Sequence, residues 1–135
     1  MTRASTQIIG LSVDKLIDRP HFETVRERMG RGVFAPALRE VVRQLWKLAR
    51  GMDEAEELGA ARRRVKQILV ISDRFGLMAV NRRAQAIMRA TANFPREGAS
   101  PPESEPLWEK LREALWDSQA LIESGRLDQE ELVPG

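Results

Sequence analysis

The sequence predicts an all-α protein, an up-down antiparallel four-helix bundle preceded by one or two short helices. Apolar residues recur at steps of three and four along most of the chain, and no alternating stretch is long enough for a strand. The helical segments are joined by short links that contain Gly or Pro, which favours antiparallel neighbours. With 135 residues, 42% of them hydrophobic, we expect one domain, made of an N-terminal segment (1–19), the bundle (20–127) and a tail (128–135).

Two short helices are expected first. Ser12 can cap a helix that runs to Ile17, and the step Asp18-Arg19-Pro20 ends it and begins another, because Pro suits a first helical turn. Gly30 and Gly32 then interrupt this second helix. Its inward side is expected to carry Phe22, Val25 and Met29.

Two long helices follow. The first, over residues 33–50, is expected to close at Gly51. The second begins where Asp53 and Glu56 resemble a capping box, and it ends at Gly76. Carboxylates in a first turn favour the positive end of the helix dipole, so we interpret the acidic group Asp53, Glu54, Glu56 and Glu57 as a cap and not as a metal site. The inward stripes are Phe34, Leu38, Val41, Leu45 and Leu48, then Leu58, Ala61, Val65, Ile68, Ser72 and Phe75.

Two further helices complete the bundle. The third long helix ends near Asn93 and Pro95, residues 97–106 form a polar surface loop, and Ser104 can cap a last helix that stops at Gly125. The expected inward residues are Leu77, Val80, Ala84, Ile87 and Thr91, then Leu107, Leu111, Leu115 and Ile122. We expect Trp46, Trp108 and Trp116 to pack at or near the edge of the core. The single core is predicted to include Phe34, Leu45, Val65, Ile68, Phe75, Ile87, Leu111 and Leu115.

Composition argues against most enzyme classes and for a cytoplasmic protein. The chain has no Cys, no apolar run that approaches the roughly 18 residues of a membrane span, and no secretory signal in residues 1–10. Its only histidine, His21, has no partner nucleophile in a recognisable motif, and the glycines form no phosphate-binding loop. We therefore expect no catalysis, no cofactor and no metal, and a function in binding another macromolecule.

Charge is divided along the chain. Residues 61–89 contain eight Lys or Arg and one Asp, a net of +7, while residues 97–135 contain ten acids and three bases, a net of −7. The two regions are either solvated faces that partly neutralise each other or, in the basic case, a docking surface for an acidic partner.

Nucleic-acid binding is one alternative function. Arg62-Arg63-Arg64 and Asn81-Arg82-Arg83 flank the turn at Gly76, as basic residues do in a helix-turn-helix. However, the positions that face the core in that motif hold Arg82 and Gln85, and the acidic last helix would repel phosphates. A homodimerising structural bundle is the third alternative.

A segment in the middle of the chain resembles a known signalling motif. Histidine phosphotransfer (HPt) domains of bacterial phosphorelays carry His-x-Leu-Lys-Gly-Ser-x-x-x-Leu-Gly on a central helix, and residues 66–76, Lys-Gln-Ile-Leu-Val-Ile-Ser-Asp-Arg-Phe-Gly, fill the same frame. Ile68 and Phe75 stand at the two Leu positions, and Gly76 is retained. The resemblance covers about residues 22–127 and includes Ala84, Met88 and the last helix from Leu107 to Ile122.

The departures from the HPt motif fall on its chemistry. Lys66 occupies the position of the phosphoacceptor His, and a protonated ammonium cannot act as the nucleophile that a neutral imidazole is. Leu69 replaces the Lys that balances phosphate charge, Val70 replaces the Gly that leaves room for a receiver domain, and Ile71 replaces the Ser. The resemblance thus implies a protein that does not accept phosphate and docks on a response-regulator receiver domain or a histidine kinase, as adaptor or inhibitor.

The implied docking surface lies on the outward side of this helix. Helical spacing is expected to place Arg62, Lys66, Val70 and Asp73 along one outward stripe. Arg63 and Leu69 lie beside this stripe, and Arg74 completes its basic border. Leu69 and Val70 either supply apolar contact area for a partner or widen the buried stripe of the helix.

Overall fold

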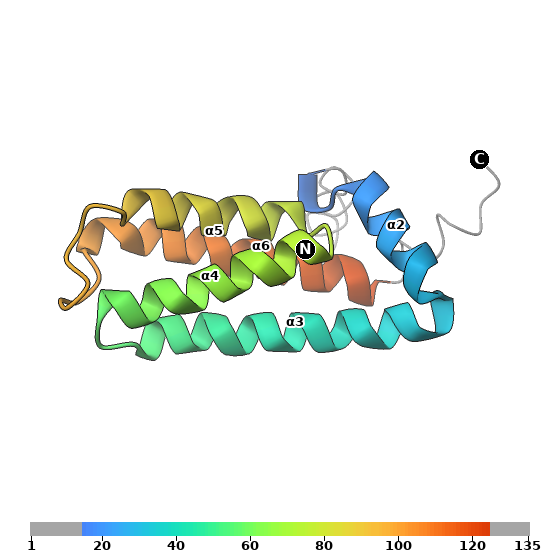
Figure 1. Ribbon diagram of the computed structural model, residues 1–135, viewed down its shortest axis with the longest axis horizontal. Helices are drawn as coiled ribbons and strands as arrows, with labels where there is room; N and C mark the ends of the chain where they lie inside the picture. The colour runs from blue at the N-terminus through green and yellow to red at the C-terminus, as the bar shows by residue number, and fades with distance from the viewer. Residues whose placement is uncertain (1–14, 125–135) are drawn as a thin grey trace, which may run out of the picture.

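The protein is all-helical in the computed structural model, which describes residues 15–124 and shows no strand among them. The helices are α2 (Arg19–Met29), α3 (Arg31–Glu54), α4 (Leu58–Arg74), α5 (Met78–Ala90), the short 3₁₀ helix η1 (Pro102–Ser104) and α6 (Glu105–Glu123). Figure 1 shows α3, α4, α5 and α6 lying along one another, with α2 at the end where α4 turns into α5. The five α-helices pack against one another around one core, which confirms the predicted class.

The core contains seven of the eight residues predicted for it: Phe34, Leu45, Val65, Ile68, Ile87, Leu111 and Leu115 are all buried. Phe75 is the exception and is only partly buried. It is the C-cap residue of α4, with φ −102° and ψ 7°, so its side chain leaves the inward stripe where the helix ends.

The start of α2 is as predicted, and the three residues expected on its inward side all pack in or against the core, with Arg26 buried beside them. Asp18 is the N-cap, and its carboxylate accepts the backbone N–H of His21. Phe22 is buried and meets Phe34 edge to face, with ring centroids 5.0 Å apart. The buried neighbour on this side is Arg26, whose guanidinium lies over the Phe22 ring and pairs with Glu23, while Val25 and Met29 are only partly buried.

Helix α3 is longer at both ends than predicted. It begins before Gly32, which lies inside it, and it continues through Gly51 to Glu54. The extension past Gly51 buries Met52 on the stripe of Leu45 and Ala49. Gly51 also permits close packing of α4, since a Cβ there would lie 3.0 Å from Nε of Arg64.

The capping box predicted at Asp53 is wrong, because Asp53 belongs to the last turn of α3 and α4 begins only at Leu58. The backbone N–H groups at the N-terminus of α4 instead donate to carbonyls of a distant loop. The backbone N–H of Leu58 donates to the Gly98 carbonyl at 2.7 Å, and that of Gly59 donates to the Arg96 carbonyl at 3.0 Å. The polar loop after α5 therefore replaces the local cap that the sequence suggested.

Gly76 ends α4 in a left-handed turn, as expected. Its φ is +68°, and the N–H of Leu77 donates to the Ser72 carbonyl at 2.9 Å, which is the Schellman pattern. The Gly76 carbonyl accepts the N–H of Asp18 at 2.8 Å, so the turn also holds the start of α2. A Cβ at position 76 would lie 3.1 Å from His21 and 3.2 Å from the backbone of Phe22.

The last helix and the tryptophans differ in part from expectation. Ser104 holds the N-cap position of α6, but its hydroxyl does not cap the helix; it donates to the Pro101 carbonyl and accepts from Trp108 Nε1 at 2.6 Å. Trp108 is buried and Trp46 half-buried, whereas Trp116 is 66% exposed, so the prediction that it packs at the core edge is wrong. The predicted Ser12 cap and Gly125 stop lie outside the described residues.

Within residues 15–124, no helix combines the length and the apolar character that crossing a membrane requires.

Replacing Ile68 with Ala tests the placement of the core. Ile68 is fully buried, so the truncation should lower the free energy of unfolding by about 2 to 5 kcal/mol in denaturant melts. Val70→Ala is the matched control on the same helix, because Val70 is 54% exposed and its truncation should change stability by about 0.5 kcal/mol or less. Equal effects of the two substitutions would mean that the inward face of α4 is misassigned.

Candidate functional site

The outward side of α4 presents cations around an apolar residue. Arg63, Lys66 and Arg74 are exposed, and Val70, 54% exposed, lies among them at helical spacing. None of the three cations forms an ion pair with another of residues 15–124. Their charge is therefore open to a partner.

Arg62 does not belong to this outward surface, contrary to the sequence-based expectation. Its guanidinium is half-buried and reaches the end of α5, where Nη1 donates to the Met88 carbonyl at 2.9 Å and to the hydroxyl of the buried Thr91. Burial, and secondly the Arg96 guanidinium, lower the pKa of Arg62 from its ordinary value. Arg62 thus joins two helices and is not available for docking.

The other two predicted site residues lie on the side of α4 that faces α5. Leu69 is partly buried against the core, so its side chain mainly widens the inward stripe, and its carbonyl accepts the Asn81 side-chain amide at 3.0 Å. Asp73 is exposed and lies near Arg82 at the rim of a small hollow. Of the seven predicted residues, the structure brings Arg63, Lys66, Val70 and Arg74 together on the outward side and places Asp73 at its border.

Helix α5 adds cations that the sequence reading did not include in the site. Asn81 bonds to Leu69 and Ser72 of α4 and so fixes how α5 is rotated. Arg82 and Arg89 are exposed and lie on the same side of α5 as Gln85, which donates to Asn81. Helical spacing from Asn81 could have revealed them. We call the combined surface the basic face: Arg63, Lys66, Val70, Arg74, Arg82 and Arg89.

The relation of α4 to α5 differs from that in a helix-turn-helix. Figure 1 shows the two helices side by side and running in opposite directions, whereas the motif crosses its helices at about 90 to 120°. Arg82 and Gln85 are exposed, although the motif would turn both positions inward.

His21 and Asp53, the residues considered for catalysis or metal binding, are each bonded to another helix. His21 Nε2 lies 3.0 Å from the Arg74 carbonyl oxygen, so the imidazole links α2 to the end of α4. Asp53, the first of the four predicted cap residues, accepts from Arg112 Nη1 at 2.8 Å and joins α3 to α6. Among the residues that the structure describes, no group of three or more His, Asp or Glu is arranged to hold a metal ion.

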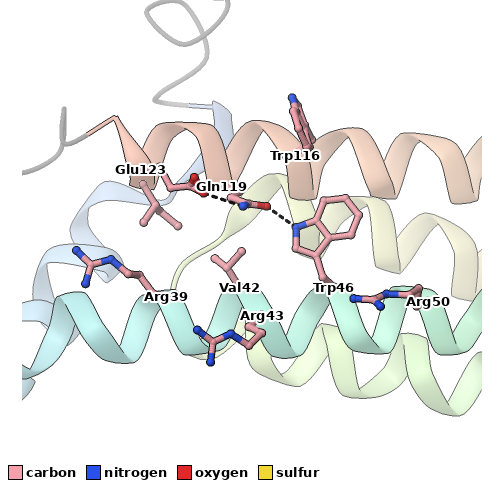
Figure 2. A pocket seen from close by; sticks show the side chains of 9 residues that line it. Arg39, Val42, Arg43, Trp46, Arg50, Trp116, Gln119 and Glu123 are labelled. Carbon is pink, nitrogen blue, oxygen red and sulfur yellow. Dashed lines mark hydrogen bonds between the residues drawn. The ribbon is translucent and has the colours of Figure 1, made fainter.

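A second candidate surface is a groove between α3 and α6, with a volume of about 690 Å³ (Figure 2). Trp46 stands in it and donates from Nε1 to Gln119 Oε1 at 2.7 Å, while Gln119 donates to Glu123. Trp116 projects from α6 away from the core. The remaining lining residues are Arg39, Val42, Arg43, Arg50 and Ile122. The packing predicted for Trp116 rests on the general tendency of aromatic residues to be buried. Trp116 follows the buried Leu115 by one residue, which is a rotation of about 100° around the helix, and it points outward.

The outward side of α6 is acidic. Burial, and secondly the Glu113 carboxylate one turn away, raise the pKa of Asp117 above its ordinary value. The acidic side of α6 borders cations of α5, because Arg82 and Arg83 line the same hollow as Glu113 and Asp117.

Comparison with models of protein families, with curated proteins and with solved structures gives no match to this chain.

The role of Arg62 can be tested against its neighbour. Arg62→Ala should lower the free energy of unfolding by about 1 to 3 kcal/mol, because it leaves the Met88 carbonyl and the Thr91 hydroxyl without their donor. Arg63→Ala, in which an exposed cation is lost from the same turn, should change it by about 0.5 kcal/mol or less. If both variants melt like wild type, Arg62 does not join α4 to α5.

Asp117 predicts a pH-dependent effect on stability. A carboxyl whose pKa is raised by folding destabilises the folded chain above that pKa, and this penalty vanishes below the ordinary Asp pKa of about 3.9. Asp117→Asn should therefore raise the melting temperature at pH 7, and the gain should shrink as the pH falls toward 4. Glu109→Gln, at an exposed carboxylate of the same helix, is the control. A gain that is independent of pH would contradict the electrostatic cause.

Proposed function

We propose that this protein is an HPt-like docking protein that binds a response-regulator receiver domain or a histidine kinase without accepting a phosphoryl group. One observation carries the proposal: Lys66, which aligns with the phosphoacceptor His, is exposed in the middle of α4, ten residues before the left-handed Gly76. The helix order also fits an up-down four-helix bundle of the HPt type, with α4 as its central helix.

A lysine at position 66 prevents phosphoryl transfer but keeps a positive charge on this surface. A lysine ammonium group has no lone pair with which to attack a phosphoryl group. Its positive charge can still pair with the carboxylates that surround the phosphorylatable Asp of a receiver domain. Binding would thus be retained while the reaction is lost.

The rest of the basic face supports docking on an acidic protein. Arg63, Lys66 and Arg74 flank Val70 at helical spacing, so long-range attraction and a small apolar contact lie on the same surface. Val70 also fills the space that the motif Gly leaves open, which would hold a receiver farther from α4. A protein that occupies the receiver in this way acts as an inhibitor of relay or as an adaptor that brings other components to it.

Nucleic acid is the second candidate, and the unpaired cations of the basic face are the observation that favours it. The antiparallel arrangement of α4 and α5 offers no recognition helix of the helix-turn-helix kind, so such binding would rest on phosphate contacts. It would weaken steeply with salt and show little sequence preference.

Site-specific cross-linking tests the proposal. A photoreactive amino acid at position 70 should capture a receiver-domain protein or a histidine kinase from the native cytoplasm, with the captured protein identified by mass spectrometry. The same group at position 94, which is also exposed but lies in the loop after α5, is the matched control. Lys66→Glu with Arg63→Glu should abolish capture at low salt without unfolding the chain, because both side chains are exposed. Arg62 is left unchanged because of its bonds to α5.

Three results would reject this function. Capture that is equal from positions 70 and 94, capture that survives the double charge reversal, or capture of nucleic acid alone would each exclude the proposed docking surface.

Phosphate incorporation gives a separate prediction. Incubation with a phosphorylated receiver domain or with a small-molecule phosphodonor should leave no acid-labile phosphate on the chain, because Lys66 replaces the acceptor. Lys66→His is the informative variant, since it restores the imidazole in the same exposed place. Labelling of the wild-type chain at His21 or Lys66 would contradict the proposal.

A further inference from the structure

The α3/α6 groove has banks of opposite charge. Three arginines of α3 line the groove. Of three exposed glutamates on α6, Glu123 lines the groove, and the other two line the adjoining hollow together with Arg112, which is paired with Asp53 and Glu105. The basic bank is Arg39, Arg43 and Arg50, and the acidic bank is Glu109, Glu113 and Glu123. Arg39, Arg50, Glu109 and Glu113 form no ion pair with another of residues 15–124. Much of the charge on both banks is therefore unneutralised.

The same face combines a protrusion with hollows. Trp116, 66% exposed, stands between the groove and a second hollow of about 580 Å³, which it shares with Trp46, Arg112 and Glu113. Figure 2 shows its indole directed away from α3. An exposed tryptophan beside an apolar hollow is the usual composition of the centre of a protein interface.

We propose that this face binds a second copy of the same chain, α3 of one subunit against α6 of the other. A partner of one charge sign would be attracted to one bank and repelled by the other. A second copy brings both signs, and a two-fold interface uses one surface patch on both subunits, so it requires a patch that is complementary to itself. The protruding Trp116 and the adjoining hollows meet the corresponding requirement of shape.

The charges select the direction of the two-fold axis. An axis across the helices would stack α3 on α3 and bring the basic banks together. An axis along the helices stacks α3 on α6 of the partner subunit. The basic bank of each subunit then faces the acidic bank of the other, at both contacts.

The register follows from bonds within one chain. Trp46 is hydrogen-bonded to Gln119, and Asp53 forms a salt bridge with Arg112. Helices α3 and α6 therefore run antiparallel, and the two residues of each pair lie at the same position along the helix axes. Rotation about an axis along the helices does not change the position of a residue along that axis. Arg50 therefore lies near Glu113 and Trp116 of the partner subunit.

The size of the face predicts a weak dimer. Residues 39–53 extend about 20 Å along α3 at 1.5 Å per residue, and two helices are about 20 Å wide, which gives a footprint of roughly 400 Å². This is below the roughly 800 Å² that each partner buries in a standard stable complex. Association should accordingly depend on protein concentration and on salt.

Charge exchange between two variants tests the proposal on the full chain. Sedimentation velocity of the wild type should show a monomer–dimer equilibrium at low salt. Arg50→Glu alone and Glu113→Arg alone should each raise the dissociation constant about a hundredfold, at about tenfold for each of the two symmetric contacts. An equimolar mixture of the two variants should dimerise like wild type, because each contact in the mixed pair again joins an acid and a base.

Trp116→Ala should also weaken the dimer, whereas Phe94→Ala, which removes an exposed aromatic from another surface, should not. Circular dichroism confirms the fold of each variant. A wild type that stays monomeric at all concentrations would overturn the proposal. So would single charge reversals without effect, a mixture that fails to recover, or dimerisation unchanged by Trp116→Ala.

Discussion

The turn at Gly76 is the constraint on which the rest of the helix arrangement depends. It ends α4 with a left-handed residue, starts α5 two residues later, and accepts the N–H of Asp18 at the start of α2. A Cβ here would crowd His21 and the Phe22 backbone, and the φ of +68° strains any residue but glycine. The same residue therefore fixes how α2, α4 and α5 are placed relative to one another. This placement in turn determines the side of α4 on which Lys66 is exposed.

Periodic apolar stripes predicted the helices and nearly all of the core, because a buried stripe is a local property of the sequence. The predictions failed where contacts with distant segments of the chain determine the structure. The backbone N–H groups at the N-terminus of α4 donate to the carbonyls of Gly98 and Arg96, 40 and 37 residues later, so the local capping signal at Asp53 was misleading. Arg62 was assigned to the surface because its position is peripheral on the helix, and only the packed end of α5 reveals its acceptors.

Two surfaces with different physical character result from this packing. The basic face on α4 and α5 carries five cations, with the carboxylate of Asp73 at its border, and this excess of positive charge suits an acidic partner. The α3/α6 face carries both signs around Trp116, which suits a copy of itself. Because the two faces use different helices, a dimer through α3 and α6 would leave both basic faces free, and one dimer could dock on two partner molecules.

We propose that the basic face is the docking site for a receiver-type protein. It is tested most directly by amide-resolved NMR of the full chain during titration with the protein that cross-links at position 70. We expect shift changes concentrated at Arg63, Lys66, Val70 and Arg74, with α3 and α6 unaffected at a fixed state of association. Changes confined to the α3/α6 face, or spread evenly over all the helices, would contradict it.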